Sequence, residues 1–175
     1  MGAKGKIGLI GLAVMGANLA RNLAGHGIST VVYNRSRDKT ENFLKEFGSD
    51  TNLSGAAALE ELVNSLEKPR KIILMIKAGE AVDAMIAKLI PLLEKDDILI
   101  DGGNSFFEDT RRRSREMEAL GVHFVGMGVS GGEEGALHGP SLMPGGTREA
   151  YDALAPILKA VSAKAEGEAC VDYMG

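Results

Sequence analysis

The residues that could do chemistry in this sequence gather in glycine-rich turns, and the first turn opens near the N-terminus. It consists of Gly11, Leu12, Ala13, Val14, Met15 and Gly16. A dinucleotide-binding turn usually has a third glycine in the middle, where this chain has Ala13. The outer glycines allow a tight turn and close packing of helix on sheet, and a helix N-terminus attracts a pyrophosphate. The spacing favours a dinucleotide site, with the methyl of Ala13 moving the pyrophosphate slightly outward, over a purely structural turn.

A basic segment about 20 residues further on indicates which dinucleotide, since enzymes that prefer NAD place an acidic residue there. This chain instead has Asn34, Arg35 and Ser36. A carboxylate would repel a 2′-phosphate, whereas the guanidinium of Arg35 can bind it bidentately. Ser36 could donate a hydroxyl, and Arg37 and Lys39 add positive charge nearby. Alternatively, Ser36 caps a helix and Arg35 is a solvated surface charge; of the two interpretations, NADP binding is favoured.

Two further turns follow apolar runs in the middle of the chain. Lys77-Ala78-Gly79 could line the crevice with its backbone, or could be an ordinary strand-to-helix turn. The second turn, over residues 101–105, contains two glycines and Asn104. An asparagine amide both donates and accepts, which suits a position between a nicotinamide and a hydroxylated substrate. Asparagine is also a common turn former, so a structural role for Asn104 is the alternative.

The last glycine cluster covers residues 126–136, and a Gly- and Pro-containing segment follows over residues 139–146. Consecutive small residues expose successive N–H groups, which predicts an anion nest for a carboxylate or phosphate. Ser130 adds a hydroxyl, and residues 139–146 are expected to form a rigid loop before the next helix. By contrast, the basic run at residues 111–115 has acidic neighbours and is expected to be a solvated helix face. No metal-ligand spacing is visible in the sequence.

These turns require strands and helices that alternate along the chain. Apolar or β-branched runs predict strands over residues 6–10, 30–33, 71–76, 98–101 and 123–125, a weaker one over 50–52, and two short edge strands within 163–173. Helical spacing predicts helices over residues 14–24, through 43–47, and over 55–65, 81–93, 107–120 and 147–160. Ser105 and Glu108 predict a capping box before the helix at 107. The alternation predicts a Rossmann-like, doubly wound α/β fold, in which a mostly parallel sheet has helices on both faces.

Composition limits the class of protein. The chain has 175 residues, 23 glycines, one cysteine and a net charge of −4. Its length and apolar content predict one globular domain over residues 1–175 rather than a disordered chain. The acidic balance gives no support for a nucleic-acid partner, and no apolar run is long enough for a membrane span. With no disulfide partner for Cys170 and no signal-peptide pattern, a cytoplasmic location is expected.

Four segments taken in order, GLAVMG, NRS, DGGNS and GVSGGEEGALHGPSLMPGG, resemble the 6-phosphogluconate dehydrogenases over essentially the whole chain. In that family alanine is normal at position 13. The resemblance implies that residues 11–16, 34–36 and Ile76-Lys77-Ala78 bind NADP, and that Asn104 contacts both cofactor and substrate. It also implies that Ser130, Gly131 and Gly132 hold 6-phosphogluconate, which the family oxidises and decarboxylates to ribulose 5-phosphate without a metal.

The same resemblance implies that the catalytic residues are not in this chain. In the family, a lysine base and a glutamate acid lie on a helix beyond position 175, followed by a large helical domain that carries the dimer surface. No catalytic residue is therefore expected within residues 1–175, which correspond to the NADP-binding domain of a homodimeric parent enzyme. The fragment alone is expected to be inactive and able to exist as a monomer. Another β-hydroxyacid dehydrogenase and a non-catalytic nucleotide-sensing module are the alternatives.

Overall fold

The computed structural model describes residues 4–49 and 52–175. Its main sheet has seven strands in the spatial order β3-β2-β1-β4-β5-β6-β7. The strands are β1 (Ile7–Ile10), β2 (Thr30–Tyr33), β3 (Leu53–Gly55), β4 (Lys71–Leu74), β5 (Ile98–Asp101), β6 (His123–Ser130) and β7 (Ser141–Gly145). Strands β1 to β6 run parallel, and β7 is antiparallel to β6. The strand order reverses between β1 and β4, so this is the switch point at which such sheets bind ligands.

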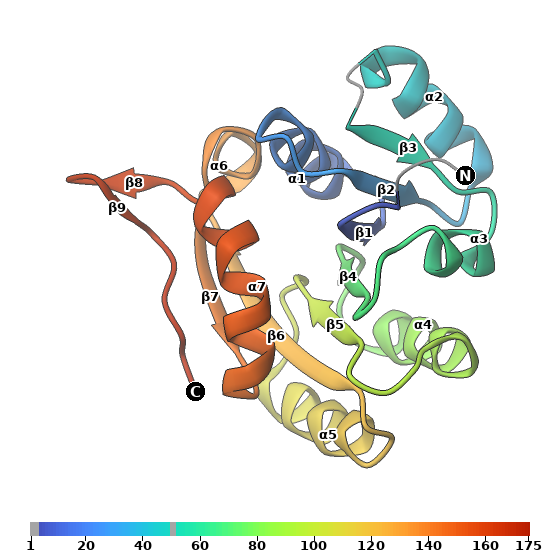
Figure 1. The fold of residues 1–175 in the computed structure, drawn as a ribbon, viewed down its shortest axis with the longest axis vertical. Helices are drawn as coiled ribbons and strands as arrows, with labels where there is room; N and C mark the ends of the chain where they lie inside the picture. The colour runs from blue at the N-terminus through green and yellow to red at the C-terminus, as the bar shows by residue number, and fades with distance from the viewer. Residues whose placement is uncertain (1–3, 50–51) are drawn as a thin grey trace.

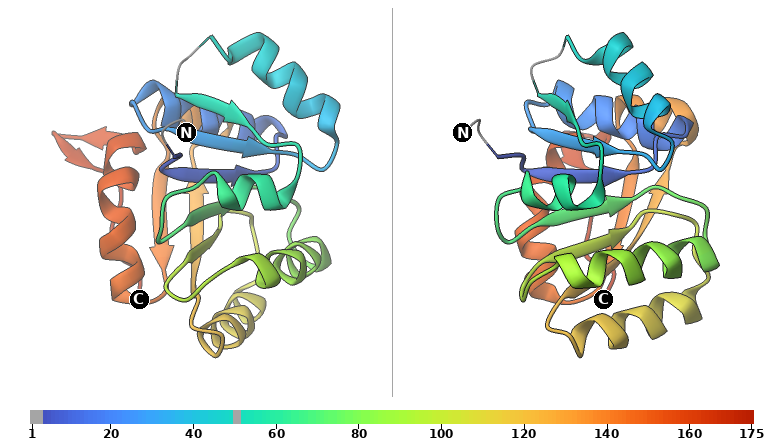
Figure 2. Two further views of the ribbon diagram at one scale, coloured as in Figure 1. Left: turned by 45° about the vertical axis from the view of Figure 1, so that its right-hand side comes forward. Right: turned by 90° about the vertical axis from the view of Figure 1, so that its right-hand side faces the viewer.

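Helices cover both faces of the sheet, which confirms the predicted fold (Figure 1). The helices are α1 (Val14–Gly25), α2 (Arg37–Phe47), α3 (Leu59–Asn64), α4 (Glu80–Leu89), α5 (Phe107–Glu118), α6 (Gly132–His138) and α7 (Arg148–Val161). One apolar core lies between the sheet and α1, α2 and α7, and a second lies between the sheet and α3, α4 and α5. Figure 2 shows that β1 and β2 run almost across the direction of β6 and β7, so the sheet is strongly twisted.

The C-terminal half of the sheet differs from the sequence prediction. Strand β6 continues through Ser130, and residues 141–145 form β7 instead of a loop. Residues 126–130 therefore pair with β7, so the prediction of an anion nest over residues 126–136 is wrong for this part of the cluster. Pro144 is tolerated in β7 because β7 is an edge strand. Beyond α7, the predicted pair of short edge strands is a separate hairpin of β8 (Lys164–Ala165) and β9 (Glu168–Ala169).

Three element boundaries also differ from prediction. The sequence predicts a weak strand over residues 50–52, of which 50 and 51 lie outside the described residues. The strand in this region, β3, starts at Leu53. The following helix, α3, therefore starts only at Leu59. Helix α4 ends at Leu89, and a 3-10 turn containing Pro91 (Ile90–Leu92) follows it. The capping box is wrong: Phe106 occupies the N-cap position of α5, and no side chain caps that helix.

A buried ion pair joins the amino ends of β4 and β5. Arg70 and Asp97 are 5% and 1% exposed, and Arg70 Nη1 lies 2.8 Å from Asp97 Oδ2. The backbone N–H of Arg70 also donates to Asp97 Oδ1, and its Nε donates to the carbonyl of Val63 in α3. This pair fastens α3 to the sheet at the end opposite the switch point.

The two outer glycines of the first turn bring α1 close to the sheet. Gly11 has φ +103°, and a Cβ atom there would lie 2.4 Å from the carbonyl oxygen of Met75. A Cβ atom on Gly16 would lie 1.9 Å from the carbonyl oxygen of Gly11. Side chains cannot be accommodated at these distances, so the structural roles predicted for both glycines are confirmed.

Replacing Gly16 with alanine should therefore push α1 away from the turn. We expect Gly16→Ala to lower the free energy of unfolding by about 1–3 kcal/mol, the usual cost of overpacking. Gly25→Ala is the matched control in the same helix, because a Cβ atom there meets nothing within 4 Å. It should be neutral or should stabilise by up to about 1 kcal/mol through helix propensity. Equal changes in the unfolding free energy of both variants, measured by urea denaturation, would contradict the close approach of α1 to the turn.

Candidate functional site

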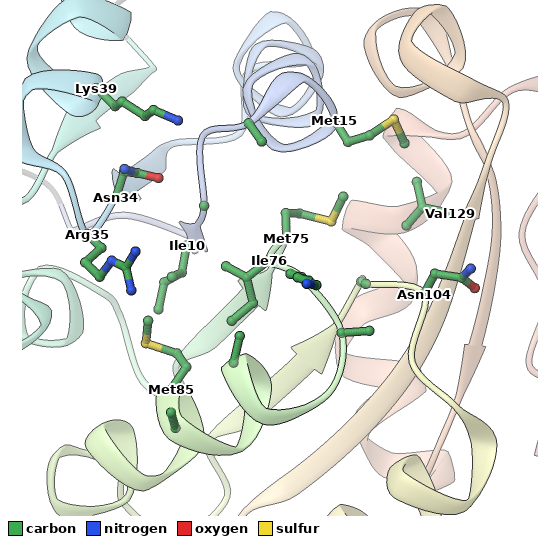
Figure 3. A pocket seen from close by; sticks show the side chains of 18 of the residues that line it. Ile10, Met15, Asn34, Arg35, Lys39, Met75, Ile76, Met85, Asn104 and Val129 are labelled. Atoms are coloured by element: carbon green, nitrogen blue, oxygen red, sulfur yellow. The ribbon is translucent and has the colours of Figure 1, made fainter.

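A cavity of about 940 Å³ opens at the carboxyl ends of the strands on both sides of the switch point (Figure 3). Its volume is in the range of small-molecule and cofactor sites. The residues that line it come from the ends of five parallel strands and from α1, α2 and α4: Ile10, Gly11, Ala13, Met15, Asn34, Arg35, Ser36, Lys39, Met75, Ile76, Lys77, Ala78, Ala81, Ala84, Met85, Lys88, Gly102, Gly103, Asn104, Gly128 and Val129. The structure thus brings together residues up to 119 positions apart, from 10 to 129.

The first turn presents an uncapped helix end to this cavity. Ala13 is the N-cap residue of α1 in an extended conformation, without a side-chain cap or an acidic residue in the first turn. The N–H groups and positive dipole of a helix N-terminus suit an anion, and no side chain competes here. Of the six predicted residues, Gly11, Ala13 and Met15 line the cavity. Leu12 and Gly16 are buried beneath the turn, whereas the side chain of Val14 is exposed outside the cavity.

Asn34 connects the first turn to the basic end of the cavity. Its Oδ1 accepts from the backbone N–H of Leu12 at 3.1 Å, and its Nδ2 donates to the carbonyl of Ser36 at 3.2 Å. Ser36 stands at the N-cap position of α2 but makes no side-chain cap hydrogen bond, so the alternative of a capping role is wrong. Arg35 and Lys39 also line the cavity, whereas Arg37 is paired with Glu41 outside it.

The cavity is locally positive although the chain is acidic. Its lining includes the cations Arg35, Lys39, Lys77 and Lys88, and no carboxylate among the described residues lines it. None of these four cations forms an ion pair with another residue in the part of the chain that the structure describes. Unpaired cations facing one cavity favour a ligand that carries several phosphate charges.

Sequence reasoning missed Lys88 and the other α4 residues of the lining. Ala81, Ala84, Met85 and Lys88 recur every three or four positions, so they share one helix face. That spacing could have identified a face of small and basic residues above the strand ends.

The cavity has chemically distinct ends. In Figure 3, Arg35 and Lys39 lie at one end, and Asn104 and Val129 lie at the other. Apolar side chains lie between them, among them Ile10, Met75, Ile76 and Met85. Asn104 is exposed, so its amide is free to meet a ligand from solvent. The arrangement suits an elongated molecule with a charged end, an apolar middle and a polar end.

A buried carboxylate supports the loop that carries Asn104. Asp101 is 2% exposed, and its carboxylate accepts from the backbone N–H of Gly103 at 3.0 Å and from the hydroxyl of Ser105 at 2.6 Å. The hydroxyl of Ser105 is therefore engaged by Asp101, which explains why it does not cap α5. Arg113 Nη1 approaches the same carboxylate at 3.4 Å.

Arg113 is buried, at 1% exposure, so the prediction that residues 111–115 form a solvated face is wrong for this residue. It lies one turn before Met117, which is also buried, and thus on the inward face of α5. Arg113 bonds both oxygens of Asp83 in α4, at 2.8 and 3.1 Å. Arg112 bonds Asp83 as well, at 2.9 Å. The hydrogen bonds from Arg113, followed by those from Arg112, lower the pKa of Asp83 to about 2.

The predicted substrate residues lie next to the cavity and do not line it. Ser130, Gly131 and Gly132 are exposed at the junction of β6 and α6, directly after Val129. Helix α6 packs against α1: Asn18 Nδ2 donates to the carbonyl of Glu133, and Asn22 Nδ2 donates to the carbonyl of Ala136. These bonds fix the junction beside the first helix.

Two other features are absent from the described residues. In residues 4–49 and 52–175, no helix is long and apolar enough to cross a membrane. Over the same ranges, no group of three or more His, Cys, Asp or Glu residues could hold a metal ion.

Comparison with known proteins gives consistent matches. The family model described as the NAD binding domain of 6-phosphogluconate dehydrogenase matches residues 6–175. The chain is 59% identical over 173 residues to an NADP(+)-dependent, decarboxylating 6-phosphogluconate dehydrogenase of Bacillus subtilis, covering 99% of this chain and 37% of that protein. A decarboxylating 6-phosphogluconate dehydrogenase of Synechococcus elongatus is 55% identical over 97% of this chain and 36% of its own length.

Solved structures agree with these matches. The 6-phosphogluconate dehydrogenase of Plasmodium falciparum, described with its cofactor NADP+ and its substrate 6-phosphogluconate, superimposes with a TM-score of 0.92 at 46% identity, covering 97% of this chain and 37% of that one. A 3-hydroxyisobutyrate dehydrogenase of Mycobacterium tuberculosis has a TM-score of 0.80 at 20% identity over 97% of this chain and 54% of that one, which shows a shared fold. The chain spans little more than a third of the length of the curated relatives that it matches.

The lowered pKa of Asp83 predicts how its contribution to stability depends on pH. Because the folded-state pKa of about 2 lies below the ordinary value of 3.8, the contribution is present above pH 4 and is lost as the pH falls toward 2. Since Asp83 is partly exposed, Asp83→Asn should cost only about 1 kcal/mol of unfolding free energy at pH 7.

Denaturation at a series of pH values measures this effect. The difference in unfolding free energy between wild type and Asp83→Asn should shrink as the pH falls from 4 to 2. Asp109→Asn is the control, because Asp109 meets Arg112 only at 3.5 Å. A difference for Asp83→Asn that stays constant from pH 7 to pH 2 would contradict the ionic role.

Proposed function

The chain belongs to the family of 6-phosphogluconate dehydrogenase NAD-binding domains, and on that premise we propose that it is the NADP-binding part of a decarboxylating 6-phosphogluconate dehydrogenase. The observation that carries this proposal is the cavity at the switch point. It combines an uncapped dinucleotide turn, four cations that have no ion-pair partner among the described residues, and an exposed Asn104 within one site. The names of the relatives supply the substrate, 6-phosphogluconate, and the reaction class.

The residues of the cavity fit NADP in a single direction. The two cations at one end, Arg35 and Lys39, suit the 2′-phosphate, because no carboxylate among the described residues lines the cavity with them. The uncapped start of α1 suits the pyrophosphate. Asn104 at the opposite end suits the carboxamide and ribose of the nicotinamide half. Bound NADP supplies the hydride acceptor, and the role of this chain is to bind and orient it.

The substrate would lie beyond the nicotinamide end. Asn104 would contact both ligands, and Ser130, Gly131 and Gly132 would hold the sugar acid. Support comes from their exposure and from their position directly after Val129, which lines the cavity. We place no catalytic acid or base within residues 1–175; these groups would come from the part of the relatives' length that this chain does not span.

Cofactor preference tests the assignment of the basic end. We expect NADPH to bind more tightly than NADH, and Arg35→Ala to weaken NADPH about tenfold, equivalent to about 1.4 kcal/mol, with little effect on NADH. Arg37→Ala is the matched control, because Arg37 is paired with Glu41 outside the cavity. Calorimetric titration of the wild type and both variants with NADPH and with NADH measures all six affinities. If Arg35→Ala left the ratio of NADPH to NADH affinity unchanged, the 2′-phosphate assignment would be wrong.

Turnover tests the assignment of the catalytic groups. The 175-residue chain should bind NADP but should not convert 6-phosphogluconate, whereas the full-length protein that contains it should release CO2 and form NADPH. Absorbance at the NADPH band and trapped CO2 measure both products. Steady turnover by the 175-residue chain would show that its own residues suffice for catalysis, and inactivity of the full-length protein on 6-phosphogluconate would refute the substrate.

A further inference from the structure

Arg113 lies at the centre of a hydrogen-bond network beneath the cavity. A guanidinium has five N–H donors, and in Arg113 each has an acceptor. Nε and Nη2 bond the two oxygens of Asp83, at 2.8 and 3.1 Å, and Nη2 also bonds the carbonyl of Gly79 at 3.1 Å. Nη1 bonds Asp101 at 3.4 Å and Ser105 at 3.3 Å. The donor capacity of the side chain is fully used, which fixes its position.

These acceptors belong to two separate walls of the cavity. Gly79 and Asp83 lie in the turn and first helical turn after β4, where Ala78 and Ala81 line the cavity. Asp101 and Ser105 flank Gly102, Gly103 and Asn104, which line it from the end of β5. Arg113 itself does not line the cavity, so any effect it has on a ligand must act through these two walls.

The connection to the second wall is direct. Asp101 holds the backbone N–H of Gly103 through one carboxylate oxygen, and Arg113 and Ser105 bond the other oxygen. A buried carboxylate needs a cation and hydrogen bonds to remain charged at low cost. The same contacts that neutralise Asp101 therefore also determine where Gly103 and Asn104 stand relative to the turn at Gly79.

We propose that Arg113 is a positioning residue for the cofactor: it holds the Lys77–Gly79 turn and the Gly102–Ser105 loop at the spacing that the nicotinamide half requires. This inference rests on the proposed binding of NADP. The proposed role does not extend to the basic end. Arg35 and Lys39 lie at the end of the cavity opposite Asn104 (Figure 3), and neither is among the hydrogen-bond partners of Arg113 in the described residues.

The inference predicts an effect that depends on which half of the cofactor is present. Arg113→Met should weaken the binding of NADPH about tenfold, or about 1.4 kcal/mol. It should change the affinity for adenosine 2′,5′-bisphosphate, the adenosine half of NADPH, by no more than about twofold. A general loss of structure would instead weaken both ligands to the same extent. Titration calorimetry on the 175-residue chain distinguishes a specific effect from a general loss of structure. It is carried out at a temperature at which circular dichroism shows that each variant is folded.

Two matched controls isolate the contacts. Arg112→Met removes the neighbouring arginine, which shares Asp83 but bonds neither Gly79 nor Asp101, and it should leave both affinities unchanged. Arg70→Met breaks the buried ion pair at the opposite ends of β4 and β5. It should lower stability without changing the affinity of the folded protein for either ligand.

Less disruptive variants keep the test decisive if Arg113→Met does not fold. Ser105→Ala removes only the hydroxyl between Asp101 and Arg113 and should weaken NADPH about threefold with no change for the bisphosphate. Arg113→Lys keeps the charge with fewer donors and should recover part of the NADPH affinity. In both Arg113 variants and in Ser105→Ala, amide hydrogen exchange at Gly103 should accelerate, a readout that needs no ligand.

The inference would be overturned if Arg113→Met weakened the binding of NADPH and of the bisphosphate equally. It would also be overturned if folded Arg113→Met and Ser105→Ala bound NADPH as tightly as wild type. A wild-type chain that binds neither ligand would overturn the proposed function, and the inference with it.

Discussion

The close approach of α1 to the ends of β1 and β4 is the constraint on which the cavity depends. Gly11 and Gly16 leave no room for a side chain, so the helix starts directly above the switch point with its first N–H groups uncapped. Asn34 then ties this turn to the end of β2 by accepting from the N–H of Leu12. The basic end and the anion-attracting helix end are thereby held in one rigid arrangement. Ala13 requires no special backbone conformation here, since its φ of −74° is ordinary for an alanine.

Charge is distributed unevenly in a way that serves this site. The chain carries a net charge of −4, yet the cavity lining contains four cations that no carboxylate neutralises in the described residues. Several arginines outside the cavity are paired with acids, as Arg37 is with Glu41 and Arg70 is with Asp97. One buried arginine–aspartate network lies at each end of the β4–β5 strand pair. The Arg70 network fastens a helix to the sheet, whereas the Arg113 network connects two walls of the cavity.

The sequence predicted the parts of this site that are local, and missed those that depend on tertiary contacts. Gly11, Asn34, Arg35 and Asn104 each follow a clear apolar strand, so their place at the strand ends could be predicted from order alone. The burial of Arg113 was missed because three neighbouring arginines suggest a solvated surface. Its spacing of four from Met117 was the signal that indicated an inward face. Strand β7 was missed because Pro144 and its glycines resemble a loop, and only the edge position in the sheet makes them compatible with a strand.

In the proposed binding mode, NADP lies in the cavity with its 2′-phosphate at Arg35 and its nicotinamide at Asn104. A crystal structure of the chain grown with NADP tests this most directly. We expect the 2′-phosphate between the side chains of Arg35 and Lys39, the pyrophosphate at the start of α1, and the nicotinamide ring beside Asn104 and Val129. A cofactor bound in the reverse direction, or bound outside this cavity, would contradict this binding mode.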